Sequence, residues 1–257
     1  MHNAALAAMG LDWAYVPFDV APDDVPAAVA GVRALGIVGV NVTVPLKETI
    51  AAHLDVVDPS AERAGSVNTI HLKDSLLYGY STDGPGLVAD WKALGWPTEN
   101  QSIYLLGAGG SARAIACSLA ERGNRITVAN RSRERSEGLV RLLNQWWPGS
   151  AVLAGLGERP ADIPGIVVNS TTIGMHPHVD DAPLLPSGLL DTRPRVYDLI
   201  YAPEETTFLS RARAAGCAAA NGLGMLVWQG ALSLSIWTGA RLEELPVEAM
   251  DQAARSA

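Results

Sequence analysis

Residues 107–112 combine glycine and small residues in the pattern of a loop that binds the phosphates of a nucleotide. The segment contains Gly107, Ala108, Gly109, Gly110 and Ser111 and follows an apolar run at 103–106. Glycine at the first two positions of this motif lets the chain turn tightly and lets a pyrophosphate reach the backbone, while the free N–H groups of a following helix bind the anion. A strand before, a helix after and a second strand about twenty residues on favour dinucleotide binding over a plain glycine-rich turn.

The segment after that second strand indicates which dinucleotide would bind. NAD enzymes usually carry Asp or Glu here, which accepts hydrogen bonds from the ribose 2′-hydroxyl. This chain instead has Asn130, Arg131, Ser132 and, three residues later, Arg135. Guanidinium groups offer paired donors that match phosphate oxygens, so the segment favours the 2′-phosphate of NADP. The alternative is a solvated basic start of a helix.

Lys47 and Asp83 are candidates for proton chemistry, because one is a cation and the other an anion at neutral pH. Lys47 follows a short apolar run and a proline, and Asp83 lies in a run of turn-forming residues at 82–86. On their own, a surface position for Lys47 and an ordinary turn role for Asp83 are the simpler interpretations.

The regions that hold these residues alternate between β-rich runs and helical stretches, which is typical of an α/β protein. We expect a parallel sheet wrapped by helices in the second half of the chain and a smaller, separate sheet in the first half. The predicted strands are 14–18, 38–42 and 67–72 in the first half, and 102–106, 125–129, 166–169, 196–199 and 217–220 in the second. The predicted helices include 25–35, 87–94 and 111–121. The turn formers at 82–86 mark the boundary between the two regions.

Composition and charge exclude several classes of partner. The 257 residues are 48% hydrophobic and 18% charged, as in a folded globular protein, and the net charge of −8 argues against nucleic acid or an anionic membrane. Cys117 and Cys217 lack a CxxC spacing, which fits a reducing compartment. No signal peptide is visible, so we expect a cytoplasmic protein. His176 and His178 fit no standard ligand spacing, so no metal site is expected.

The uncharged segment 214–240 is predicted to be a buried helix, because its polar groups would lack partners in a bilayer. Met225, Gln229, Leu232 and Ile236 fall on one helical face, so Gln229 is an amide within an apolar stripe. Such an amide needs a hydrogen-bond partner, either a backbone carbonyl or a polar ligand such as a polyhydroxylated ring.

Eight segments spread over the chain resemble the shikimate dehydrogenase family. They are Asn-Val-Thr-Val-Pro-Leu-Lys at 41–47, Gly-Ser-Val-Asn-Thr-Ile at 65–70, Gly-Tyr-Ser-Thr-Asp-Gly at 79–84, Gly-Ala-Gly-Gly-Ser-Ala-Arg at 107–113, Asn-Arg-Ser at 130–132, Asn-Ser-Thr-Thr-Ile-Gly-Met at 169–175, Tyr-Asp-Leu-Ile-Tyr at 197–201 and Asn-Gly-Leu-Gly-Met-Leu-Val-Trp-Gln at 221–229. Their order and spacing match across nearly the whole chain, which a shared fold alone would not explain.

The resemblance implies an N-terminal α/β substrate-binding domain, a Rossmann-like NADP-binding domain, and C-terminal helices that return to the first domain. We assign residues 1–84 and 223–257 to the substrate domain and 85–222 to the NADP domain. The implied activity is the reduction of 3-dehydroshikimate to shikimate with NADPH, which supplies chorismate and aromatic amino-acid biosynthesis. The expected partners are these small molecules, and the expected assembly is a monomer or homodimer.

The resemblance also assigns roles to individual residues. Lys47 and Asp83 are the implied catalytic pair, because hydride transfer leaves negative charge on the ketone oxygen and a cation in hydrogen-bond reach stabilises it. The implied substrate contacts are Thr43, Asn68, Asp83, Tyr201 and Gln229. The implied NADP contacts are Gly107, Ala108, Gly109, Gly110, Ser111, Asn130, Arg131, Ser132 and Arg135, with Leu199 and Gly222 near the nicotinamide.

The sequence departs from the family pattern in three places. Ser81 stands where the family usually has Asn, and Leu46 where Phe or His is commoner. Family members also begin with a strand and a Ser-x-Ser-Pro segment that binds the substrate carboxylate, whereas this chain starts at Met1-His2-Asn3. We therefore expect the 257-residue chain to have weak activity that upstream residues would restore. The alternatives are a quinate or aminoshikimate dehydrogenase, or a catalytically silent NADP-binding homologue.

Overall fold

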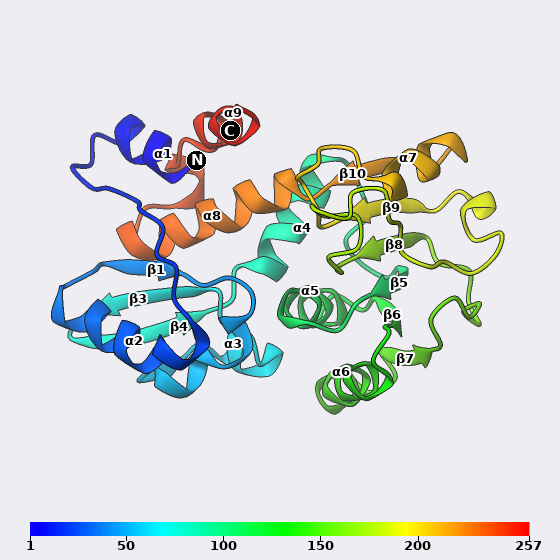
Figure 1. The fold of residues 1–257 in the computed structure, drawn as a ribbon, viewed down its shortest axis with the longest axis horizontal. Helices are drawn as coiled ribbons and strands as arrows, with labels where there is room; N and C mark the ends of the chain where they lie inside the picture. The colour runs from blue at the N-terminus through cyan, green and yellow to red at the C-terminus, as the bar shows by residue number, and fades with distance from the viewer. Residues whose placement is uncertain (257) are drawn as a thin grey trace.

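The computed structural model describes residues 1–256 and contains two separate β-sheets with helices packed around each (Figure 1). The helices of this region are α1 (His2–Ala8), α2 (Val25–Ala34), α3 (Pro59–Ala64), α4 (Asp83–Ala93), α5 (Gly110–Ala120), α6 (Arg133–Trp146), α7 (Thr207–Ala214), α8 (Leu223–Thr238) and α9 (Val247–Arg255). None of these helices has the length and apolar character that crossing a membrane requires.

The larger sheet is parallel throughout and occupies the second half of the chain. Its strands are β5 (Ser102–Leu106), β6 (Arg125–Ala129), β7 (Ala151–Ala154), β8 (Ile166–Asn169), β9 (Arg195–Asp198) and β10 (Ala219–Asn221), in the order β10-β9-β8-β5-β6-β7. From β5 the chain first adds β6 and β7 on one side and then β8, β9 and β10 on the other side. In open α/β sheets this switch point, at the carboxyl ends of the strands, is where a dinucleotide binds.

Alternate residues of β5 pack into two hydrophobic cores, one on each face of the large sheet. Ile103 and Leu105 pack with α4, α5 and α6, whereas Tyr104 and Leu106 pack with Phe208 of α7 on the opposite face. Both faces of this sheet are therefore buried, which explains why its strands are apolar runs without a polar alternation. We call this sheet with α5, α6 and α7 the large-sheet lobe.

The smaller sheet is mixed. Its strands are β1 (Gly39–Asn41), β2 (Val56–Val57), β3 (Thr69–Lys73) and β4 (Leu76–Tyr80), in the order β1-β3-β4-β2, with β2 parallel to β4 and the other pairs antiparallel. Helix α2 packs on the face that carries Ile70 and Leu77. Helix α8 packs on the other face, where Trp237 Nε1 donates to the carbonyl of Ile70 at 2.9 Å. We call this sheet with α1, α2, α3, α8 and α9 the small-sheet lobe.

Helices α4 and α8 lie side by side between the two sheets, and both chain ends lie near α1 and α9 (Figure 1). Glycine makes the close approach of α4 possible. A Cβ on Gly86 would lie 2.8 Å from Cβ of Gln229 in α8, and a Cβ on Gly84 would lie 2.6 Å from the carbonyl oxygen of Ala114 in α5. Helix α4 therefore touches both lobes through positions that admit no side chain.

The structure confirms the α/β class and the five strands predicted for the second half, with shifts of one or two residues at some ends. It corrects three expectations. Residues 14–18 have no regular secondary structure and pair with no strand in the described chain, so that predicted strand is wrong. Strands β2, β4 and β7 were missed. The turn formers at 82–86 begin helix α4, because two of them are the glycines that helix packing requires.

Candidate active site

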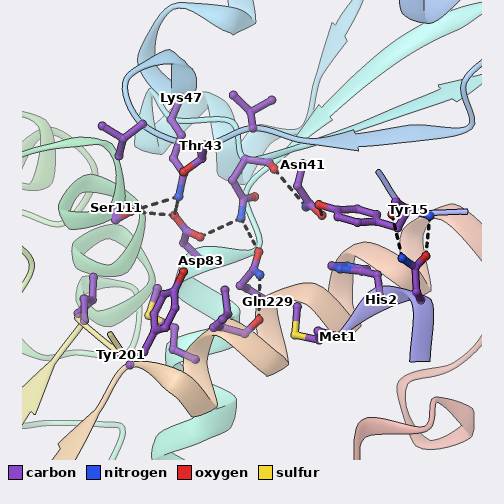
Figure 2. A pocket seen from close by; sticks show the side chains of 18 residues that line it. Met1, His2, Tyr15, Asn41, Thr43, Lys47, Asp83, Ser111, Tyr201 and Gln229 are labelled. Atoms are coloured by element: carbon purple, nitrogen blue, oxygen red, sulfur yellow. Dashed lines mark hydrogen bonds and ion pairs between the residues drawn. The ribbon is translucent and has the colours of Figure 1, made fainter. Parts of the chain in front are cut away.

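A pocket of about 470 Å³ lies between the two lobes. Its lining combines residues from both of them, and Figure 2 shows their side chains converging on one space. The predicted site residues that line it are Thr43, Lys47, Asn68, Asp83, Ser111, Leu199, Tyr201, Gly222 and Gln229. The pocket therefore brings together, from segments far apart in the sequence, every predicted catalytic and substrate-binding residue.

Lys47 and Asp83 form an ion pair at the centre of this pocket. Lys47 Nζ lies 2.7 Å from Asp83 Oδ2, and the two side chains are 12% and 5% exposed. Lys47 comes from the short 3-10 helix Leu46–Glu48 after β1, and Asp83 is the first residue of α4. Ser111 completes a triangle, because its Oγ lies 3.2 Å from both Lys47 Nζ and Asp83 Oδ2. The pair of opposite charges is shielded from most solvent and is held in place by a hydroxyl of the other lobe.

Asn68 fixes the second oxygen of Asp83. Its Nδ2 donates to Asp83 Oδ1 at 2.8 Å, and its Oδ1 accepts from the backbone N–H of Thr82 at 2.7 Å. The same amide group donates to Gln229 Oε1 at 3.2 Å. Asn68 is buried, so its orientation is set by these bonds, and Asp83 presents a fixed carboxylate to the pocket.

Gln229 has a different environment from the apolar stripe that the sequence predicts. Its Nε2 donates to the carbonyl of Leu226 at 2.8 Å, which is the backbone partner considered above. Ser233, one turn further along α8, hydrogen-bonds to Thr69 at 2.7 Å, while Leu232 and Ile236 are only partly buried. The face of α8 that carries Gln229 therefore also has a polar contact through Ser233, which the predicted apolar stripe did not include.

Thr43 and Tyr201 lie at the open edge of the pocket. Both residues are exposed, and Tyr201 retains 46% of its surface. In Figure 2, Thr43 lies next to Lys47, and Tyr201 lies on the other side of Asp83. Each of these lining residues carries a hydroxyl group, which can both donate and accept a hydrogen bond.

The predicted phosphate loop joins β5 to α5 at the switch point of the large sheet. Gly107 has a φ of +111°, a conformation that side-chain-bearing residues rarely adopt, and a Cβ on Gly109 would meet nothing within 4 Å. The first N–H groups of α5 have no acceptor inside the helix. Ala108 is buried behind the loop. The loop thus offers free donors beside open space, which is what a pyrophosphate needs.

Leu199 and Gly222 close the pocket from the large-sheet lobe. They follow β9 and β10, whose carboxyl ends lie on the same edge of the sheet as the phosphate loop. A Cβ on Gly222 would collide with the carbonyl group of Leu199, so glycine is required for these two loops to approach. Leu199 and Gly222 therefore line the same pocket as the ion pair.

The basic segment after β6 begins helix α6. Ser132 is its N-cap and accepts from the N–H of Arg135 at 3.4 Å, and Asn130 Nδ2 donates to the carbonyl of Ser132 at 3.1 Å. Arg131 is exposed, and Arg135 forms an ion pair with Glu48, with Nη2 and Oε1 2.7 Å apart. These residues lie outside the central pocket but at the adjoining edge of the sheet.

Several pocket residues were missed by the sequence analysis. Asn41 donates to Ser233 Oγ at 2.9 Å and accepts from the Tyr15 hydroxyl at 3.0 Å, and His2 stacks on Tyr15 with ring centroids 4.2 Å apart. Burial lowers the pKa of His2 to about 4 and raises the pKa of Tyr15. The four-residue spacing of Gln229 and Ser233 was a usable signal for the polar face of α8.

The carboxylate of Asp198 is buried at the end of β9, next to the loop that carries Leu199 and Tyr201. Asp198 accepts hydrogen bonds from Thr206 Oγ1, Asn169 Nδ2 and the N–H of Ile200. Burial raises its pKa to about 6 even though these bonds favour the charged form. The carboxylate ties β9 to the start of α7 and so fixes the loop that carries Leu199 and Tyr201.

Within residues 1–256, no group of three or more His, Cys, Asp or Glu side chains is arranged to hold a metal ion. His176 and His178 are exposed. The polar groups of the pocket are its ion pair and its hydroxyl and amide side chains.

The order of the large sheet, its glycine loop and the ion pair that faces it define a dinucleotide-dependent dehydrogenase. Two family models match the chain, the shikimate dehydrogenase substrate binding domain over residues 1–70 and the shikimate 5′-dehydrogenase C-terminal domain over residues 222–255. The shikimate dehydrogenase (NADP+) of Moorella thermoacetica is 44% identical over 264 residues, which cover 100% of this chain and 88% of that protein. The chain belongs to the shikimate dehydrogenase family.

Solved structures of shikimate dehydrogenases and of a related reductase share the fold of this chain. A shikimate dehydrogenase in complex with NADP+ matches with a TM-score of 0.91 and 39% identity, covering 99% of this chain and 88% of that one. A ligand-free 5-ketofructose reductase of Gluconobacter sp. strain CHM43 matches with a TM-score of 0.88 and 34% identity, covering 99% and 91%. Because proteins named for different substrates share this fold, the fold alone does not determine the substrate.

Proposed function

We propose that this protein reduces the ring ketone of 3-dehydroshikimate to shikimate with NADPH. The observation that carries the proposal is the ion pair between Lys47 and Asp83, 2.7 Å apart in a pocket whose opposite wall comes from the large-sheet lobe. A ketone held above this pair would face the carboxyl edge of the large sheet, where the cofactor of this fold binds. The pathway served is the supply of chorismate for aromatic amino-acid biosynthesis.

The residues around the phosphate loop fit NADP. Gly107, Gly109 and the N–H groups at the start of α5 would hold the pyrophosphate, and the side chains after β6 would hold the 2′-phosphate, with Arg131 and Arg135 as charged donors. Leu199 and Gly222 provide the wall against which the nicotinamide would lie. The bound cofactor supplies the hydride.

The chain's own residues supply charge and a proton. Lys47 Nζ can donate a hydrogen bond to the ketone oxygen and stabilise the negative charge that develops there. Asp83 Oδ2 holds the ammonium group, and Asn68 holds Asp83 through its other oxygen. The Lys47–Asp83 pair provides the proton that converts the developing alkoxide into the product alcohol.

The polar groups of the pocket suit a ring that carries several hydroxyl groups. Asn68 and Gln229 offer amides, and Thr43 and Tyr201 offer hydroxyls at the edge. Leu199 and Gly222 of the large-sheet lobe line the pocket beside these polar groups. Amide and hydroxyl donors reject an analogue that lacks their partners much more strongly than an apolar pocket would.

We further propose that residues 1–84 and 223–257 form the substrate domain and residues 85–222 the NADP domain. The distribution of strands supports this division, because β1–β4 all precede residue 84 and β5–β10 all lie between residues 85 and 222. Helices α8 and α9 then return to the small-sheet lobe, as their shared core with α1 indicates.

Steady-state kinetics of Lys47→Ala test the proposed function. We expect turnover of 3-dehydroshikimate with NADPH to fall by about 10²- to 10⁴-fold, as is typical for loss of a group that acts in proton transfer. The dissociation constant for NADP+ should change little, because Lys47 belongs to the substrate side. Parallel assays of the parent chain with quinate and 5-ketofructose determine the substrate.

Two results would contradict the proposal. Retention of parent-level turnover by Lys47→Ala would remove the residue from the reaction. NADP+ binding by the parent chain without any turnover would identify the protein as a silent NADP-binding homologue.

A further inference from the structure

The 3-10 helix that carries Lys47 touches the large-sheet lobe at two neighbouring residues. Lys47 contacts Ser111 at 3.2 Å, and the next residue, Glu48, forms an ion pair with Arg135 whose Oε1 and Nη2 atoms are 2.7 Å apart. A Cβ on Gly110 would lie 3.1 Å from Cβ of Lys47 and 3.7 Å from Cγ of Glu48. One short turn of the small-sheet lobe is therefore seated on both the phosphate loop and the basic segment.

The ion pair of Glu48 uses a guanidinium group that the proposed cofactor also needs. Arg135 lies on the first turn of α6, three residues after the N-cap Ser132, where a 2′-phosphate would bind. Among the ion pairs within residues 1–256, none involves Arg131. Carboxylates and phosphates bind guanidinium groups through the same paired N–H donors, so the two anions compete for Arg135. A phosphate placed there would also be repelled by a carboxylate already in contact with the same group.

We propose that Glu48 competes with the 2′-phosphate of NADP for Arg135, and that cofactor binding therefore breaks one of the contacts that seat the Lys47 turn on the large-sheet lobe. The inference rests on the proposed NADP site. It makes Glu48 a specificity-determining residue that lowers affinity for the phosphorylated cofactor alone. It also couples occupancy of the cofactor site to the position of the catalytic lysine, because Glu48 and Lys47 are consecutive.

The two side chains of this pair are 36% and 54% exposed, so the pair contributes little to folding stability. We therefore expect the loss of this ion pair to change the relative affinities for different ligands rather than the free energy of unfolding. NAD+ lacks the 2′-phosphate and leaves Arg135 with Glu48. NADP+ and its fragment 2′,5′-ADP both carry the 2′-phosphate, which must replace the Glu48 carboxylate at Arg135.

The test compares the full chain with Glu48→Gln. Calorimetry at low salt gives the dissociation constant of each protein for NADP+, NAD+, 2′,5′-ADP and 5′-AMP. Glu48→Gln should bind NADP+ and 2′,5′-ADP about 3- to 10-fold more tightly than the parent, while NAD+ and 5′-AMP should bind unchanged. Glu48→Ala should behave like Glu48→Gln. Glu205→Gln is the matched control, because Glu205 also forms an exposed ion pair with an arginine, Arg213, at 2.9 Å.

A double-mutant cycle attributes the effect to the pair. In an Arg135→Gln background, which by itself weakens NADP+ binding, Glu48→Gln should tighten NADP+ binding much less than it does in the parent, because only the repulsion between carboxylate and phosphate is left to remove. Unchanged or weaker NADP+ binding by both Glu48 variants would overturn the proposal, as would an equal gain for NAD+. A parent chain with no preference for NADP+ over NAD+ would instead contradict the proposed cofactor site, so the two failures are distinguishable.

Discussion

Ser111 connects the glycine-rich loop to the proposed catalytic pair, although its sequence position predicts only phosphate binding. Its hydroxyl donates to Asp83 and accepts from Lys47, so it restrains both charges from the opposite lobe. We expect Ser111→Ala to lower kcat about 3- to 10-fold, because one hydrogen bond to a charged pair is lost. The KM for NADPH should change less than kcat, and Ser111→Thr should restore part of the rate. A rise in KM with kcat unchanged would show that the hydroxyl serves the cofactor instead.

At the residue scale, the sequence identified the charged pair only through its resemblance to a family. Lys47 and Asp83 are separated by 35 residues and lie on different elements, so no local spacing indicates that they meet. The contacts of Glu48 with Arg135 and of Asn41 with Ser233 were missed for the same reason, since each joins segments that only the tertiary fold brings together.

At the scale of elements, two glycines in helices are expected to respond to alanine with opposite signs. On Gly86 in α4, a Cβ would lie 2.8–3.0 Å from Cβ and backbone atoms of Gln229, and backbone cannot move aside cheaply. The overpacking should cost about 1–3 kcal/mol, which exceeds the gain in helix propensity of about 1 kcal/mol. Gly31 in α2 is the control, because a Cβ there meets nothing within 4 Å.

Urea unfolding of the two variants checks this expectation. Gly31→Ala should raise the free energy of unfolding by about 0.5–1 kcal/mol, and Gly86→Ala should lower it. Gly86→Ala should also lower the activity, since the displaced Gln229 belongs to the pocket. Equal stabilisation by both substitutions would contradict the packing argument.

The elements that could be predicted are those whose burial fixes their pattern. The strands of the large sheet are covered on both faces and appear as apolar runs, and β5, β6 and β8 were located correctly. The strand β2 has two residues and gives no periodicity. Residues 14–18 carry aromatic and β-branched side chains but pair with no strand of the described chain, because strand formation depends on a neighbour as well as on propensity.

At the scale of the whole molecule, the site exists only because two lobes meet. Lys47, Asn68 and Gln229 belong to the small-sheet lobe, whereas Ser111 and Leu199 belong to the large-sheet lobe. Helix α4 begins at Asp83 and packs against both α5 and α8. A displacement of either lobe would therefore separate the Lys47–Asp83 pair from the edge of the large sheet where we propose that the cofactor binds, so the proposed reaction depends on the stability of the large-sheet lobe.

The buried carboxylate of Asp198 makes that stability depend on pH. Its pKa in the folded protein is about 6, above the ordinary value of 3.8, because burial disfavours the charged form. Between these two values the folded state binds a proton that the unfolded chain has released, so the stabilising contribution is complete below about pH 4 and is lost as the pH rises through 6. A difference of about two pKa units corresponds to about 3 kcal/mol.

Asp198→Asn cannot ionise and removes this dependence. The free energy of unfolding of the parent, measured relative to that of Asp198→Asn, should therefore decrease by up to about 3 kcal/mol between pH 4 and pH 7.5. Urea titrations of both proteins at several pH values give this difference, and contributions from other titrating groups cancel in it. A difference that stays constant with pH, or that grows in favour of the parent as the pH rises, would show that Asp198 is ionised in the folded protein at pH 4, held by the hydrogen bonds from Thr206 and Asn169.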